Sequence, residues 1–290
     1  MAVNWYPGHM HKARKKIKEI MPQIDLVIEV MDARIPYSSE NPLVTQLRES
    51  RPCIKILNKD DLADPESTKA WMDHFELETN VKAIALDKSR KGQIRQLPAL
   101  CRKMLAGRKG PTRTLRVLIM GIPNVGKSTL INILAGKILA KVGDEPAVTK
   151  QQQRIGLDNN IELIDSPGML WPRMKDEDIG YRLAVSGAIK NTALEFEDVA
   201  LYAADYFISA YPDEIISRYK LNSLPESGIK LLEAIAKKRG GLRPGGEIDL
   251  HKASEVLLHE FRLGKLGRLS LETPQMILQK ANETEYLDKQ

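Results

Sequence analysis

Short hydrophobic runs bounded by polar residues mark strands in the first two-thirds of the chain. The runs that predict strands are 25–31, 53–57, 81–86, 115–120 and 161–164. Continuous hydrophobic runs are typical of strands that are buried on both faces. Helical patterns separate these runs, so the alternation predicts an α/β fold, a mostly parallel sheet with helices on both faces.

The pattern changes after about residue 176. Hydrophobic residues at helical spacing fill 179–219, 228–238 and 250–263, and no further buried strand is evident. We therefore predict two domains, an α/β domain over 1–178 and a small α-helical domain over 179–290. A Gly, Pro and basic stretch at 107–111 predicts a linker within the first domain.

Composition limits which classes of partner and which cellular compartment fit this chain. Lys and Arg total 44 against 38 Asp and Glu, a net charge of +6, which is compatible with a polyanionic partner. Two distant cysteines exclude a disulfide scaffold and a cysteine zinc site. The chain has neither a signal-peptide pattern nor a membrane-spanning hydrophobic run, so we expect a cytoplasmic protein without a membrane partner.

The segment Gly121–Ser128 fits the phosphate-loop pattern G-x-x-x-x-G-K-S, after a predicted strand and before a predicted helix. Lys127 is expected to reach the β- and γ-phosphates, and Ser128 to bind Mg²⁺. The residues expected to contact the nucleotide here are Asn124, Val125, Gly126, Lys127, Ser128 and Thr129. The loop alone does not distinguish ATP from GTP.

Asn58–Asp61 fits N-K-x-D at the end of a predicted strand. The Asp61 carboxylate can accept hydrogen bonds from both N1–H and the exocyclic amino group of guanine, and adenine has no such donor pair. Asn58 can bond the O6/N7 side of the base, and the Lys59 stem can cover the ring. An ATP-dependent kinase is therefore disfavoured.

Asp165–Gly168 fits D-x-x-G, also at the end of a predicted strand. Asp165 is expected to hold Mg²⁺ through water, and the Gly168 N–H to sense the γ-phosphate. Thr149 is the only Ser or Thr between Thr129 and Asp165, so it is the one candidate for a hydroxyl that closes on Mg²⁺ and γ-phosphate. A solvated loop threonine is the alternative.

The order of these motifs is unusual. In the usual GTPase N-K-x-D follows D-x-x-G, whereas here it precedes the phosphate loop, and none is found beyond Gly168. Circular permutation explains this order, because a compact sheet tolerates it when the new joint is a surface loop. The stretch 107–111 would be that joint.

Four segments resemble the circularly permuted GTPases of the ribosome biogenesis GTPase A (YlqF) type. They are Trp5–Met10, Asp32–Pro36, Gly121–Ser128 and 237–268. The resemblance implies a GTP-hydrolysing factor, active late in assembly of the large (50S) ribosomal subunit, that binds rRNA and is stimulated by the particle. It places the fifth GTPase box near 85–88, so Leu86 and Asp87 are expected beside the base. We also expect a monomer.

Hydrolysis needs a substitute for the glutamine that follows D-x-x-G in Ras-like enzymes, because Met169 cannot orient water. The resemblance points to His9, whose imidazole can position or deprotonate water. The second candidate is Asn124, which in similar GTPases holds K⁺ beside the phosphates. His9 as a packing or RNA-contacting residue, and Asn124 as a loop-forming residue, remain open.

Two basic sets could contact RNA phosphates. One comprises His11, Lys12, Arg14, Lys15, Lys16 and Lys18, and the other Lys237, Lys238, Arg239, Arg243, Arg262, Lys265 and Arg268. Solvated surface residues are the alternative for both sets. A GTPase of tRNA modification or translation, or a GTP-dependent switch with negligible turnover, would share the nucleotide motifs.

Overall fold

The computed structural model describes 8–106, 113–138, 153–157, 160–171, 176–189, 195–241, 243, 245 and 247–287, with 8–13 and 284–287 by backbone only. The predicted linker at 107–111 lies outside these residues. The chain divides into two compact units. One comprises residues 4–173 together with 272–290, and the other comprises residues 174–271 with the first three residues.

A six-stranded sheet forms the centre of the first unit, in the order β3-β2-β1-β4-β6-β5. Its strands are β1 (Leu26–Asp32), β2 (Cys53–Asn58), β3 (Val81–Leu86), β4 (Leu115–Gly121), β5 (Gln153–Leu157) and β6 (Ile161–Asp165). Only β5 runs antiparallel to its neighbour. Asp32 lies level with Asn58, and Asn58 with Leu86. The carboxyl ends of β1, β2 and β3 therefore form one edge, where the predicted base-binding residues gather.

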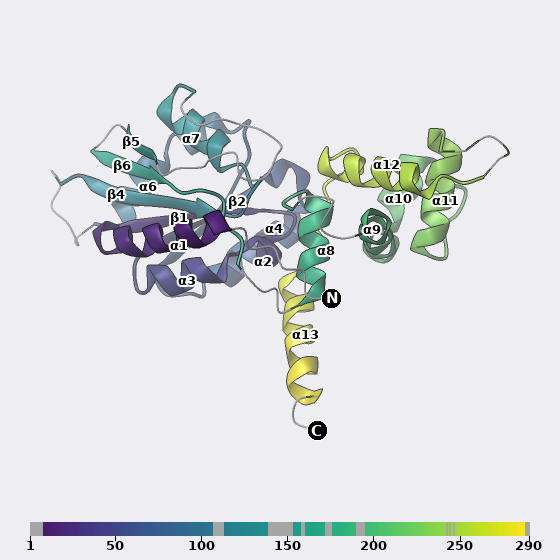
Figure 1. Ribbon diagram of the computed structural model, residues 1–290, viewed down its shortest axis with the longest axis horizontal. Helices are drawn as coiled ribbons and strands as arrows, with labels where there is room; N and C mark the ends of the chain where they lie inside the picture. Colours follow the sequence, from purple (N-terminus) through teal and green to yellow (C-terminus); the bar gives the residue numbers. More distant parts are fainter. Residues whose placement is uncertain are drawn as a thin grey trace. The chain divides into compact units, whose positions relative to one another are not determined.

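Helices cover both faces of this sheet (Figure 1). The helices of this unit are α1 (Gly8–Ile20), α2 (Pro36–Ser39), α3 (Pro42–Arg48), α4 (Pro65–Phe75), α5 (Lys91–Ile94), α6 (Leu97–Met104), α7 (Lys127–Ala135) and α13 (Pro274–Leu287), with 3₁₀ turns η1 (Met21–Gln23) and η2 (Asp60–Leu62). Of these, α13 contacts α4 and does not cover the sheet. One core cluster joins α1, η1 and α3 to Val27, Cys53 and Leu118 of the sheet. Another packs Trp71 and Phe75 of α4 on Leu57. Burial of these side chains, at about 25 cal/mol per Å², stabilises the layers.

The second unit is entirely helical in its described part. It comprises α8 (Glu177–Ser186), α9 (Phe196–Ala210), α10 (Pro212–Tyr219), α11 (Gly228–Arg239) and α12 (Leu250–Arg262). Hydrophobic faces of α9, α11 and α12 pack together, with Phe207 and Leu257 fully buried. Asp176 caps α8, because its side chain accepts a hydrogen bond from the Asp178 N–H.

The predicted α/β fold with its parallel sheet is confirmed, and so is the helical C-terminal region. The pattern missed β5, whose residues are mostly exposed and therefore carry no hydrophobic run. The division near residue 173 lies five residues before the predicted one at 178. The prediction that all of 179–290 forms one domain is wrong at its end, because 272–290 belongs to the first unit.

Glu272 accounts for this return of the chain. Its buried carboxylate accepts hydrogen bonds from the Ser38 N–H (2.8 Å) and hydroxyl (2.5 Å). Its carbonyl accepts bonds from the Ser67 hydroxyl (3.0 Å) and the Trp71 indole N–H (3.1 Å). These four bonds fix the segment before α13 on α2 and α4.

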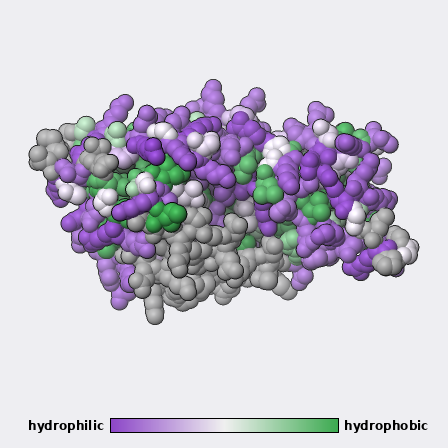
Figure 2. Space-filling view, turned by 90° about the horizontal axis from the view of Figure 1, so that it is seen from above, coloured by the Kyte–Doolittle hydropathy of each residue, from purple (hydrophilic) through white to green (hydrophobic). Residues whose placement is uncertain are grey.

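The face of the molecule seen in Figure 2 is mostly hydrophilic, with hydrophobic residues in separate patches. Within the described ranges, no helix combines the length and the apolar character that crossing a membrane requires.

Candidate nucleotide-binding site

The phosphate loop leaves β4 at Gly121 and enters α7 at Lys127. Asn124 (φ 59°) and Gly126 (φ 96°) have left-handed backbone conformations, which lets the chain turn sharply before the helix. A Cβ at Gly126 would lie 2.2 Å from the Asn58 amide nitrogen, so only glycine fits there. The N-terminus of α7, with Ser128 and Thr129 half-buried, is thus presented as an anion site.

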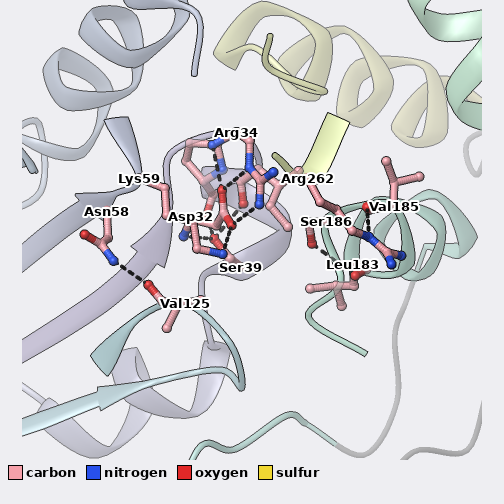
Figure 3. Close-up of polar contacts among 12 residues, drawn as sticks. Asp32, Arg34, Ser39, Asn58, Lys59, Val125, Leu183, Val185, Ser186 and Arg262 are labelled. Carbon is pink, nitrogen blue, oxygen red and sulfur yellow. Dashed lines mark hydrogen bonds and ion pairs between the residues drawn. The ribbon is translucent and has the colours of Figure 1, made fainter. Parts of the chain in front are cut away.

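Asn58 joins the N-K-x-D segment to the phosphate loop. Its side-chain amide donates a 2.6 Å hydrogen bond to the carbonyl of Val125 (Figure 3). The two motifs, 67 residues apart, therefore meet at the carboxyl edge of the sheet. The predicted contact between Asn58 and the base stays a prediction.

Asp32, the last residue of β1, organises the residues around Lys59. Its carboxylate accepts hydrogen bonds from Arg34 Nε (2.9 Å) and Nη2 (2.8 Å) and from Lys59 Nζ (2.8 Å) (Figure 3). Burial alone would raise the pKa of Asp32, but the two cations outweigh it and hold that pKa well below its usual range. The charged end of the Lys59 side chain is thereby fixed to Asp32. The Lys59 backbone has a left-handed conformation (φ 64°), so the chain turns sharply after β2.

The two neighbouring aspartates of the N-K-x-D segment have different roles. Asp60 is buried and pairs with Arg90 (2.6 Å), and Arg90 Nε also contacts Asp87 (2.9 Å). Asp61 is exposed, and its carboxylate has no hydrogen-bond or ion-pair partner among the described residues. Asp61 is therefore placed to accept bonds from a ligand.

Leu86 ends β3 and Asp87 follows it directly, and both are buried. Burial opposes ionisation of Asp87, but hydrogen bonds from the Ser89 hydroxyl and N–H lower its pKa overall. Because Arg90 bridges Asp60 and Asp87, the loops after β2 and β3 are held together at this edge of the sheet.

Asp165, at the end of β6, has the features of a divalent-cation ligand. It is 1% exposed, and neither carboxylate oxygen has a hydrogen-bond partner among the described residues. Burial raises its pKa to about 6, with Lys127 opposing. Burial also lowers the pKa of Lys127 itself. An unpartnered buried carboxylate gains most from a cation, so Asp165 fits Mg²⁺ together with Ser128.

The segment after Asp165 packs directly on the phosphate loop. A Cβ at Gly168 would lie 3.1 Å from the Pro123 Cα and N atoms, so the chain approaches closely because this residue is glycine. The Met169 N–H donates to the Gly121 carbonyl (3.2 Å). The Met169 side chain is buried in the cluster with Ile17, Met21 and Met120. Met169 is therefore a packing residue in this structure.

Two predicted catalytic residues are not described at the side-chain level. Thr149 lies outside the described residues, and His9 lies in the first part of α1 (8–13), of which only the backbone is described. Their roles stay predictions.

No sequence pattern predicted a role for Asp32, Arg34 or Asn41. The sequence carried a signal for Asp32, because this residue ends a hydrophobic strand. In the structure it lies level with Asn58 on the neighbouring strand. Asn41 carried a weaker signal, an Asn-Pro pair at a helix start, and its long-range partner depends on the tertiary fold.

Comparison with known proteins agrees with this geometry. Residues 116–234 match the family model described as 50S ribosome-binding GTPase. The chain is 44% identical to ribosome biogenesis GTPase A of Priestia megaterium, over 94% of this chain and 98% of that protein. It is 43% identical to the Bacillus cereus protein of the same name, over the full length of both.

Solved structures give the same result. The fold is similar to the crystal structure of GNP-bound YlqF from Thermotoga maritima, with a TM-score of 0.63 and 30% identity over 91% of this chain and 98% of that one. The GDP-bound structure of that protein gives a TM-score of 0.64 over 90% and 99%.

Proposed function

The chain belongs to the ribosome biogenesis GTPase A family, and from this premise we propose that it acts late in maturation of the large (50S) ribosomal subunit. It is a GTPase of ribosome biogenesis with a circularly permuted, mostly parallel sheet. The proposal adds that it binds rRNA, that the particle stimulates its hydrolysis of GTP, and that it works as a cytoplasmic monomer. Similarity over the full length, both units included, is the observation that carries this proposal.

In the proposed mechanism, the chain binds the nucleotide at three places. Asp61 selects guanine, Leu86 and Asp87 close the side of the base, and Lys127 with the loop residues Asn124, Val125, Gly126, Ser128 and Thr129 holds the phosphates. Ser128, Thr149 and Asp165 are the residues that would hold Mg²⁺. When bound, Mg²⁺ neutralises charge that develops on the phosphates.

Burial of Met169 supports slow intrinsic hydrolysis, since this side chain packs in the core and cannot contact the attacking water. We propose that His9 positions the water, or that K⁺ held by Asn124 supplies positive charge. Single-turnover hydrolysis separates these two possibilities. It is measured for wild type and His9→Ala, in K⁺ and in Na⁺, with and without large subunits. Loss of stimulated turnover only in His9→Ala assigns His9, and loss only in Na⁺ assigns the cation.

The described basic residues support contact with RNA phosphates. Arg14, Lys15, Lys16 and Lys18 of α1 are exposed, and so are Lys237, Lys238, Arg239, Arg243, Lys265 and Arg268. Arg262 is an exception, because its guanidinium donates to the Ala184 and Val185 carbonyls at the end of α8 (Figure 3). We therefore remove Arg262 from the second predicted set.

Sedimentation of the tagged protein with GTP, GDP and a non-hydrolysable analogue tests the partner. We expect co-sedimentation with large-subunit precursors that is strongest with GTP or its analogue. Recovery with tRNA and not with the precursors would contradict the proposal and favour a role in tRNA modification or translation. Charge reversal at Lys15 and Lys16 should weaken sedimentation, whereas reversal at the exposed Lys69 of α4 should not.

A further inference from the structure

Asn41 is a buried residue that connects the D-x-x-G segment to α3 and β1 of the GTPase unit. It is 1% exposed and lies at the start of α3, before Pro42. Its side-chain amide donates a 2.8 Å hydrogen bond to the carbonyl of Met169, which is 128 residues away in the sequence. No nucleotide motif contains Asn41, and it lies on a different element from each of them.

The other polar groups of Asn41 are also engaged, and this fixes the direction of the amide. Its side-chain oxygen accepts a 3.0 Å bond from the Leu43 N–H and so caps α3. Its backbone N–H donates a 2.9 Å bond to Oε1 of Glu29, a fully buried residue of the central strand β1. The amide is therefore set by a helix start and by the sheet at the same time.

Met169 is held on its other side by the phosphate loop. Its N–H donates to the Gly121 carbonyl, and Gly168 lies so close to Pro123 that a Cβ would be 3.1 Å from the Pro123 backbone. Residues 168–169 are thus enclosed between the phosphate loop and Asn41. If the Asn41 bond were lost, the Met169 carbonyl would lose its connection to α3, and only the phosphate-loop contacts and the buried Met169 side chain would hold this segment.

We propose that Asn41 is a positioning residue for GTP hydrolysis, which holds the Gly168 N–H where the γ-phosphate binds. This rests on the proposed GTPase function and on the expectation that the Gly168 N–H contacts the γ-phosphate. A donor that is placed before the ligand arrives costs no reorganisation on binding, so fixing it favours the state that contains the γ-phosphate. GDP makes no contact with this donor, and its affinity is independent of Asn41.

Asn41→Ser tests the proposal, because serine keeps the helix cap but is too short to reach the Met169 carbonyl. We expect the preference for a non-hydrolysable GTP analogue over GDP to fall about three- to tenfold, as for loss of one hydrogen bond, with GDP affinity unchanged. The turnover number should fall with it. Hydrogen exchange of the 166–171 amides in the analogue complex should become faster.

Asp64→Ser is the matched control. Asp64 caps α4, also before a proline, and accepts bonds from the Glu66 and Ser67 N–H groups. Both variants should lose some thermal stability, but only Asn41→Ser should lose nucleotide discrimination. Asn41→Asp, which keeps the size and the cap but removes the amide donor, is the second variant and should behave as Asn41→Ser does above neutral pH.

Gly168→Ala separates the two proposals. If Gly168→Ala lowers the preference for the analogue and both Asn41 variants do not, Asn41 is only a helix cap and the inference is overturned. If Gly168→Ala also leaves the preference unchanged, the role proposed for Gly168 is itself wrong.

Discussion

At the scale of single residues, the acidic side chains of the site form two groups. One group pairs with other protein residues, and the other is placed to contact a ligand. Asp32, Asp60 and Asp87 are buried and paired with cations or donors. Asp61 is exposed, and the buried Asp165 carboxylate has no hydrogen-bond partner in the part of the chain that the structure describes. Paired carboxylates hold the loops, and the other two are available to guanine and Mg²⁺. Burial and partners, which the sequence does not show, distinguish the two groups.

Asp61 is the residue at which we predict that guanine specificity can be changed. In Asp61→Asn one acceptor becomes a donor, which suits xanthine better than guanine. We expect GDP affinity to fall by about 1.5–3 kcal/mol, as for a hydrogen bond to a charged group, and affinity for xanthosine diphosphate to rise. Titration of both nucleotides measures this, with Asp73→Asn, an exposed aspartate of α4, as control. Equal weakening of both nucleotides would contradict the prediction.

Glu29 makes stability depend on pH. Burial, with the nearby Glu40 carboxylate, raises its pKa to about 8 from 4.5, although Lys55 opposes this. The unfolded chain releases this proton near pH 4.5, so the stabilisation is complete below pH 4.5 and is lost as pH rises to about 8.

We therefore expect the unfolding free energy to fall between pH 5 and 8 by up to about 1.4 kcal/mol per pH unit from this group. Glu29→Gln, which mimics the protonated form, should flatten the profile in urea unfolding. Parallel profiles for the two proteins would show that Glu29 stays ionised.

At the scale of elements, parallel strands bring distant loops to one edge, and side chains then join those loops. Asn58 ties the β2 loop to the phosphate loop, and Arg90 ties it to the β3 loop. The expected base site therefore depends on loops that follow three strands, β2, β3 and β4, rather than on one motif.

Arg90→Gln should loosen the β2 and β3 loops around the base. Because Arg90 is partly exposed, its pairs contribute about 1 kcal/mol at most, so we expect affinities for GDP and GTP to fall equally and by up to about fivefold. Arg95→Gln, an exposed neighbour, should leave both affinities unchanged. A loss confined to GTP would assign Arg90 to the phosphates instead.

At the scale of the whole molecule, the helical unit is an insertion. The chain enters it near residue 173, soon after Gly168 and Met169, and returns to the GTPase unit at Glu272. The segment expected to respond to γ-phosphate is thus covalently joined to the unit that carries the second basic set.

Glu272 should contribute to the stability of the GTPase unit. Glu272→Ala leaves the buried Ser38 N–H and hydroxyl without their acceptor, so we expect the unfolding free energy to fall by about 1–3 kcal/mol. Urea unfolding measures this, and Glu283→Ala, an exposed residue of α13, is the control. An unchanged midpoint would mean that the α2 contact adds nothing to the packing of α13.

The entry into the helical unit should transmit the nucleotide state. We expect higher affinity for the large-subunit particle with GTP than with GDP, by a coupling of about 1–3 kcal/mol, and a flexible insert after Lys175 should reduce it. The same insert after Ser223, in an exposed segment of the helical unit, should not. If the insert after Lys175 leaves the difference between the GTP and GDP affinities unchanged, the coupling runs through another contact.

The sequence by itself determined five of the six strands, the three nucleotide motifs, their permuted order and the family. Those features depend on local patterns, namely hydrophobic runs for β1 to β4 and β6, glycines where the backbone must turn, and fixed motif spacing. It missed β5, because a mostly exposed strand at the sheet edge has no hydrophobic run.

Only the tertiary structure decided which polar residues are partners. The bonds from Asn58 to Val125, Asn41 to Met169 and Ser38 to Glu272 join residues 67, 128 and 234 positions apart. The pattern of one segment carries no information on such pairs, since they form only when the sheet aligns the ends of its strands. The same alignment buries Asp165 and Lys127, and burial is what shifts their pKa values.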